Sequence, residues 1–182
     1  MRADARENYD RLVSVAAGAF ARDGGDATLK AIAREAGVGI GTLYRHFPTR
    51  ESLVDAVYRA ETQRLCDAAT DLLGERAPLD ALREWALRFL DYMATKEGMA
   101  EVLHTVLSGD EGLRLETRAR ITEALRLLIA AGQGAGRLRA GLDAGDVSLA
   151  LGGFALILRG RPDAREAGGR LFDLLARGLA AG

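Results

Sequence analysis

Apolar residues recur every three or four positions along most of the chain, which is the spacing of one face of an α-helix. The first such stripe runs from Tyr9 to Phe20. No stretch alternates apolar and polar residues with the period of two that a half-buried strand requires. The three prolines, Pro48, Pro78 and Pro162, fall between the periodic stretches, where helices begin or end. The pattern therefore predicts an all-α protein.

Glycines, prolines and capping residues divide the periodic stretches into nine expected helices. The helices are expected at about residues 4–22, 29–35, 39–46, 50–73, 78–96, 99–107, 113–131, 144–159 and 163–179, with the third beginning at residue 39 or 40. The first three form a small N-terminal domain, residues 1–48. The other six form a larger C-terminal domain, residues 49–182.

The second and third expected helices follow the helix-turn-helix plan of a short helix, a tight turn containing glycine, and a second short helix. Leu43 and Phe47, four residues apart, place one apolar face of the second short helix against the core. The outer residues of that helix include hydroxyl, aromatic, guanidinium and imidazole groups but no carboxylate, which suits a helix that meets DNA. These outer residues are Ile40, Gly41, Thr42, Tyr44, Arg45 and His46.

Charge adds modest support for a nucleic-acid partner at the N-terminal end. The 182-residue chain has a net charge of −1. Residues 1–50 hold eight Lys or Arg against six Asp or Glu, whereas residues 51–182 hold 17 against 20. Hydrophobic residues, at 48%, suffice for a packed core. A polar start and the lack of an apolar run long enough for a bilayer favour a cytoplasmic protein without a membrane partner.

Few residues suggest chemistry other than binding. Cys66 is the single cysteine, so no intrachain disulfide can form, and two histidines provide no cluster of metal ligands. We find no nucleophile–base pair, no glycine-rich phosphate loop and no paired carboxylates in a defined setting. We therefore expect no catalytic residue, no metal site and no cofactor.

The stretch of residues 28–53 resembles the TetR family of transcriptional repressors, and the resemblance extends over about residues 5–55. One departure is Gly39, where the family usually has Ser or Ala. Glycine is still an acceptable N-cap, but it removes one possible phosphate contact. The residues that carry the resemblance are Thr28, Ile32-Ala33, Ala36-Gly37-Val38, Gly41-Thr42-Leu43-Tyr44-Arg45-His46-Phe47, Arg50 and Leu53.

The resemblance implies a role in DNA binding for ten residues. Those expected at phosphates are Thr28, Thr42, Tyr44, His46 and Arg50. Those expected at or near the base edges and the groove are Lys30, Gly39, Ile40, Gly41 and Arg45. Other roles stay open for some of them: Thr28 is a good helix cap in any protein, Tyr44 fits a half-buried position, His46 fits a helix C-terminus, and both arginines fit an ordinary surface.

The fifth and sixth expected helices carry a wide apolar arc with aromatic and methionine side chains around a few polar groups, which suits a pocket for an apolar ligand. TetR-like proteins have their cavity among these helices and the seventh. Ordinary core packing is the alternative for each residue. The expected lining residues are Trp85, Phe89, Tyr92, Met93, Leu103, His104, Leu107 and Phe154.

The eighth helix is apolar nearly all round and the ninth carries a broad apolar stripe, so both need a second packing partner. A four-helix bundle across a twofold axis of a homodimer would supply one, and Gly168-Gly169 would allow close approach there. Packing inside a single subunit is the alternative. The expected interface residues are Val147, Leu151, Phe154, Leu158, Leu171, Phe172, Leu174 and Leu175.

Together these patterns predict a dimeric repressor that binds a palindromic operator in double-stranded DNA and leaves it when a small, largely apolar molecule binds the C-terminal domain. An activator, or a DNA-binding protein without a ligand, would use the same fold. An enzyme or a small-molecule carrier without a role on DNA fits the sequence less well. The sequence does not specify the effector or the operator.

Overall fold

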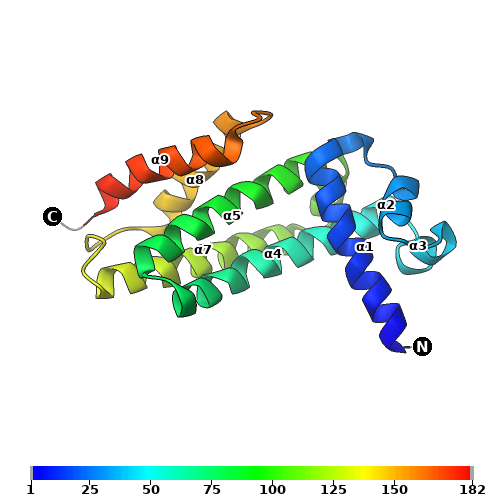
Figure 1. Cartoon of the computed structure of the whole chain (residues 1–182), viewed down its shortest axis with the longest axis horizontal. Coiled ribbons are helices and arrows are strands. Elements are labelled where there is room, and N and C mark those ends of the chain that lie inside the picture. Colours follow the sequence, from blue (N-terminus) through cyan, green and yellow to red (C-terminus); the bar gives the residue numbers. More distant parts are fainter. Residues whose placement is uncertain (1, 181–182) are drawn as a thin grey trace. The chain divides into compact units, whose positions relative to one another are not determined.

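The computed structural model describes residues 2–180, with side chains from residue 4 onward, and this part of the chain confirms the all-α prediction (Figure 1). In the described residues the only β feature is an isolated bridge between Leu138 and Ala180. The elements are α1 Arg2–Asp23, the 3-10 turn η1 Gly24–Asp26, α2 Leu29–Glu35, α3 Ile40–His46, α4 Arg50–Glu75, α5 Pro78–Gly98, α6 Ala100–Gly109, α7 Glu111–Gly134, α8 Ala144–Leu158 and α9 Ala164–Leu179.

The chain forms two compact units that do not coincide with contiguous segments. The N-terminal unit contains the residues up to Glu61 together with Thr95–Arg114. The C-terminal unit contains Thr62–Ala94 together with the residues from Leu115 on. Helices α4, α5 and α7 therefore contribute to both units, and α6 belongs to the N-terminal one. The expected domain boundary after residue 48 stays a prediction.

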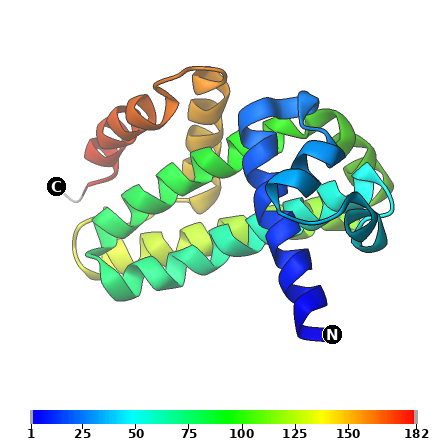
Figure 2. The same cartoon turned by 45° about the vertical axis from the view of Figure 1, so that its right-hand side comes forward.

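In the N-terminal unit, α1 packs with the two short helices α2 and α3 (Figure 2). Its apolar stripe faces inward, and Leu12 and Phe20 are fully buried together with Ile32 and Leu43. The end of α5 approaches the end of α1 backbone to backbone. A Cβ atom on Gly98 would lie 1.8 Å from the carbonyl oxygen of Phe20, so only glycine fits there.

The break between α6 and α7 is shorter than the sequence suggests. We expected residues 109–112 to be irregular, yet only Asp110 separates the two helices. The carboxylate of Asp110 accepts a hydrogen bond of 2.9 Å from the backbone N–H of Leu113. This bond satisfies one of the free donors in the first turn of α7, which allows the helix to begin immediately.

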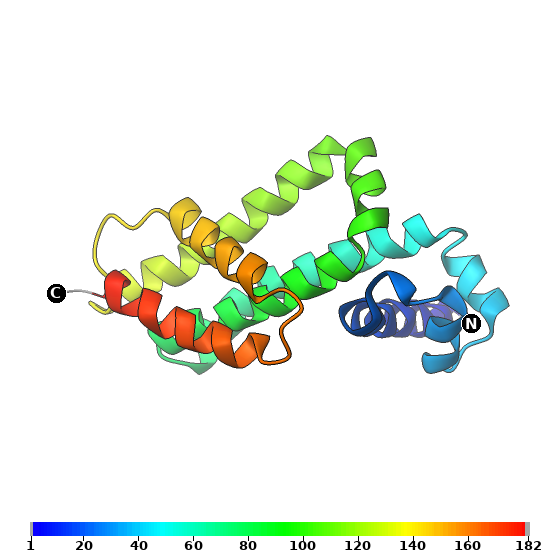
Figure 3. The ribbon, with the colours of Figure 1, turned by 90° about the horizontal axis from the view of Figure 1, so that it is seen from above.

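The C-terminal unit is built around Trp85 of α5, which is completely buried. Its indole N–H donates to the backbone oxygen of Leu65 in α4 at 2.8 Å, so the polar end of this large side chain is satisfied. Further along the chain, α8 and α9 lie side by side (Figure 3). Within the described residues, no helix is long and apolar enough to cross a membrane.

Helix α9 packs on α5 through its two consecutive glycines. A Cβ atom on Gly168 would lie 2.2 Å from Leu90 Cδ1, and one on Gly169 would lie 2.9 Å from Arg83 Nη2. The expectation that these glycines permit close approach between subunits was therefore wrong, because α5 of the same subunit occupies that space. An exposed ion pair between Arg83 and Asp173, at 2.7 Å, joins the same two helices.

Candidate nucleic-acid interface

Thr28 begins α2 and combines two features that a phosphate contact requires. Its hydroxyl accepts a hydrogen bond of 3.1 Å from the backbone N–H of Ala31, which caps the helix. Because a hydroxyl both accepts and donates, its proton remains available to an acceptor outside the helix. The side chain is exposed. The cap and an external contact are therefore compatible at Thr28, although the sequence offered them as alternatives.

The turn between α2 and α3 has the conformation that its glycine predicts. Gly37 has a φ of +68°, the left-handed region that glycine adopts at no steric cost. Gly39 is the N-cap of α3 with a φ of −67° and has no side chain to cap the helix. The backbone N–H of Thr42 is bonded instead to the carbonyl oxygen of Gly39 at 2.9 Å.

Helix α3 separates its residues into a buried and an outer side. Leu43 is completely buried and Phe47, directly after the helix, is nearly so. The large side chains of Ile40 and Tyr44 are exposed by 42% and 49%, which is unusual for residues of this type and leaves them free to contact a partner. Of the remaining outer residues, Gly41 and Arg45 are exposed, while Thr42 and His46 are half-buried.

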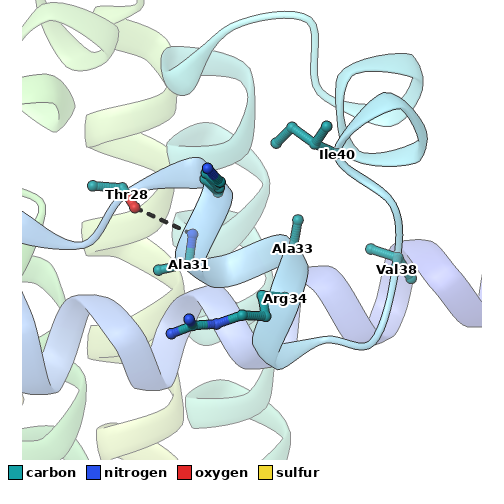
Figure 4. Close-up of a pocket in the computed structure, with 7 residues that line it drawn as sticks. Thr28, Ala31, Ala33, Arg34, Val38 and Ile40 are labelled. Atoms are coloured by element: carbon teal, nitrogen blue, oxygen red, sulfur yellow. Dashed lines mark hydrogen bonds between the residues drawn. The ribbon is translucent and has the colours of Figure 1, made fainter.

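An open hollow of about 780 Å³ lies between α2 and the start of α3 (Figure 4). Two cations, Lys30 and Arg34, and no carboxylate are among its lining residues. Glu35 at the end of α2 is paired with Arg22 of α1 at 3.0 Å, which offsets its negative charge. The sequence analysis did not select Arg34. Its position one turn after Lys30 on the same short helix was the available signal. The lining residues are Thr28, Lys30, Ala31, Ala33, Arg34, Val38 and Ile40.

The start of α4 is fixed by a reciprocal cap. The backbone N–H of Ser52 donates to the Thr49 hydroxyl, and the backbone N–H of Thr49 donates to the Ser52 hydroxyl, both at 3.2 Å. This is a capping box with serine in the position that Glu or Gln usually holds. Arg50, the first residue of α4, is half-buried and donates hydrogen bonds to backbone carbonyl groups within the N-terminal unit.

Tyr9 of α1 is a second residue that the functional prediction missed. Its ring lies 4.9 Å from the ring of Phe47 and 6.0 Å from that of His46, measured between centroids. Tyr9 is also 38% exposed. The three rings join the N-terminal half of α1 to the end of α3. The sequence gave no signal for this contact, because α1 and α3 are far apart along the chain.

The residues expected to bind a ligand lie in both units. In the C-terminal unit, the Trp85 and Phe89 rings stack with centroids 5.8 Å apart, and Tyr92 continues this row at 6.2 Å from Phe89. The Tyr92 hydroxyl is 3.4 Å from that of Thr62, and both residues are buried. The half-buried residues in this unit are Met93 and Phe154.

The other three expected ligand residues belong to the N-terminal unit. Leu103 is buried and Leu107 is half-buried. His104 is exposed, and its Nδ1 atom lies 2.9 Å from the Ser108 hydroxyl one turn further along α6. A surface position is a simpler description of this histidine than a pocket lining. In the described part of the chain, no three His, Cys, Asp or Glu side chains gather as metal ligands.

Four of the expected interface residues, Val147, Leu151, Leu158 and Phe172, are buried within the subunit. Their apolar surface is therefore already covered by the chain itself. Phe154, Leu171 and Leu175 are half-buried, and Leu174 is exposed. The apolar side chains that the subunit leaves uncovered on α8 and α9, each exposed by 62 to 70%, are Leu149, Leu156, Ile157 and Leu174.

Both parts of the chain match known protein families. Residues 12–57 match the model of the bacterial regulatory proteins of the tetR family, and residues 77–181 match the C-terminal domain of SbtR-like transcriptional regulators. A 54-residue segment is 43% identical to HTH-type transcriptional regulators of Staphylococcus aureus. This alignment covers 29% of the chain and 29% of those relatives.

Solved structures match over nearly the whole length. The TetR transcriptional regulator SCO0520 of Streptomyces coelicolor is 44% identical, with a TM-score of 0.86 over 95% of this chain and 98% of that one. A TetR regulator of Mycobacterium vanbaalenii is 33% identical, with a TM-score of 0.77 over 99% of both chains. A third structure, described as the molecular basis for control of antibiotic production by bacterial hormones, is 26% identical with a TM-score of 0.72, over 96% of this chain and 98% of that one.

The helix-turn-helix geometry, the matched family models and the full-length structural relatives agree. The chain belongs to the TetR family of DNA-binding transcriptional regulators.

Proposed function

We propose that this protein is a dimeric repressor that binds a palindromic operator through α2, α3 and the start of α4. The observation that carries the proposal is the outer face of α3 beside the cationic hollow. That face exposes Tyr44 and Arg45 without a carboxylate, and Lys30 and Arg34 line the hollow next to it. Such a surface attracts phosphates and offers donors and an aromatic ring to base edges.

Dimer formation through α8 and α9 is proposed on the side chains that the subunit leaves uncovered. Leu149, Gly153, Leu156 and Ile157 occupy positions i, i+4, i+7 and i+8, which is one face of α8. Gly153 has open space where a side chain would be, so a partner backbone can approach closely. Two recognition helices about 34–36 Å apart would then enter successive major grooves, and the operator would have matching twofold symmetry.

The effector is proposed to be a small, largely apolar molecule that binds in the C-terminal unit. The row of Trp85, Phe89 and Tyr92 offers aromatic surface, and the Thr62–Tyr92 hydroxyl pair offers a polar group beside it. The relative whose description names bacterial hormones supports an organic effector. A ligand that binds the DNA-free state more tightly would lower operator affinity by that difference in affinity. Repression would then be relieved.

Operator binding by Tyr44→Ala and Arg45→Gln tests the proposal. Each change removes a group from the outer face of α3 and should lower the affinity for a promoter fragment at least ten-fold. Arg137→Gln, an exposed arginine in the C-terminal unit, is the control for the loss of one positive charge and should change little. Fluorescence anisotropy at several salt concentrations is the measurement. If wild-type protein ignored every fragment of its own promoter region at low salt, the proposal would fail.

A further inference from the structure

The guanidinium group of Arg50 is fully engaged inside the N-terminal unit. Its Nη1 donates to the carbonyl oxygen of Ala27 at 2.5 Å, and its Nη2 donates to that of Gly25 at 3.1 Å. The same group lies over the ring of Phe20, 5.3 Å from the centroid. These three contacts come from a residue that is 23 positions or more away along the chain.

The two carbonyl groups need such a partner. They follow the end of α1, where the last carbonyl groups of a helix lack intrahelical donors and carry partial negative charge. The segment reverses direction at Gly24, whose φ is +60°, and its only other backbone tie is a 3.3 Å bond from the N–H of Ala27 to the oxygen of Gly24. A planar, two-pronged cation that also stacks on a ring fits this site, whereas a lysine ammonium does not offer that geometry.

We infer that Arg50 is a positioning residue for operator binding, which holds residues 25–27 in place and thereby aligns Thr28, instead of binding a phosphate itself. Thr28 follows directly on Ala27 and caps α2. The cap orients the first turn of α2, which carries Lys30 into the hollow. The inference rests on the operator contacts proposed above, because it states how one of them is aligned.

The two roles for Arg50 make opposite predictions for Arg50→Lys. A lysine retains the charge and is a good point contact for a phosphate, so a phosphate-binding Arg50 would tolerate the change. A positioning Arg50 would not, and operator affinity should fall about ten-fold. The slope of log affinity against log salt should stay the same, because no phosphate contact is replaced by a neutral group. Arg59→Lys, the same change at an exposed site on the same helix, is the matched control.

A double-mutant cycle with Thr28→Ala provides the second test. If Arg50 acts through Thr28, the loss in the double variant Thr28→Ala/Arg50→Lys should be clearly smaller than the product of the two single losses. Independent contacts would give a simple product. Circular dichroism and the melting temperature of each variant, measured without DNA, establish that the protein remains folded. Arg50→Gln is measured as well and should lose no more affinity than Arg50→Lys.

Three outcomes would overturn the inference. The first is unchanged operator affinity in Arg50→Lys. The second is a simple product in the cycle. The third is a normal Arg50→Lys combined with an Arg50→Gln whose salt slope falls by about 0.9, which is the signature of one lost phosphate contact. In each case the wild type still binds the operator, so the result is distinct from failure of the proposed function, in which the wild type does not bind.

Discussion

At the scale of single residues, the helix-turn-helix motif depends on a few positions whose backbone conformations differ even when the residue type is the same. Gly37 and Gly39 are both exposed and both have open space around them, so neither is a glycine because of crowding. Gly37 needs its left-handed backbone, whereas Gly39 has an ordinary extended one. The two positions should therefore respond differently to a side chain.

Gly37→Ala is expected to destabilise the protein by about 1 kcal/mol, since an L-residue is strained at positive φ. Gly39→Ser should be neutral or stabilising by a few tenths of a kcal/mol, because serine is at least as good an N-cap as glycine. The new hydroxyl also lies at the start of the recognition helix and should raise operator affinity. Urea denaturation and anisotropy measure these effects. A destabilised Gly39→Ser with a stable Gly37→Ala would contradict the assignment of the turn.

The sequence was sufficient for residues whose role is local. The cap at Thr28, the turn at Gly37 and the buried side of α3 follow from spacing within a few residues, and the structure confirms them. The contacts of Arg50 and Tyr9 could not be predicted. They join positions that are distant along the chain, and a partly exposed Arg or Tyr is compatible with many environments.

At the scale of elements, helix boundaries were predictable but the inward side of α8 was not. An apolar helix offers several stripes, and periodicity does not reveal which of them meets a partner in the same subunit. The expected stripe of Val147, Leu151 and Leu158 is covered by the subunit, and Leu156 and Ile157 face outward. The same limit applies to Gly168, which the sequence marked as a point of close approach without identifying α5 as the partner.

The attachment of α9 to α5 is expected to depend on glycine packing more than on charge. Gly168→Val should cost about 1–3 kcal/mol, because Leu90 must move to make room. Asp173→Asn should cost under about 1 kcal/mol, because its ion pair with Arg83 is exposed. Urea denaturation of both variants is the measurement. Equal losses would contradict this ranking.

The same ion pair sets a weak pH dependence. The hydrogen bond from Arg83 lowers the pKa of Asp173. A carboxyl whose pKa is lowered on folding stabilises the fold above its unfolded pKa of about 3.9 and loses that contribution as pH falls through the folded pKa. Wild type and Asp173→Asn should therefore differ by a constant small amount from pH 5 to pH 8, and converge only in stronger acid.

At the scale of the whole molecule, the uncovered side chains of α8 and α9 determine whether the regulator assembles. Ile157→Glu combined with Leu156→Glu places two charges on the proposed interface and should give a monomer in light scattering. Operator affinity should then fall about a hundred-fold or more, because two linked half-site contacts become separate ones. Leu127→Glu, a similar change at an exposed leucine of α7, is the control. A dimeric double variant would exclude this surface.

The contact of Gly98 with the end of α1 limits how this regulator can be recombined with others. The N-terminal unit is completed by residues 95–114, which are separated in the chain from the helix-turn-helix by most of α4 and α5. A chimera that joins residues 1–61 to a foreign sensor would therefore give its reading head a new neighbour at Phe20. Unless that neighbour also brings a bare backbone within touching distance, α1 must shift. Exchange of sensors between such regulators is thus restricted to donors that carry a glycine at the equivalent corner.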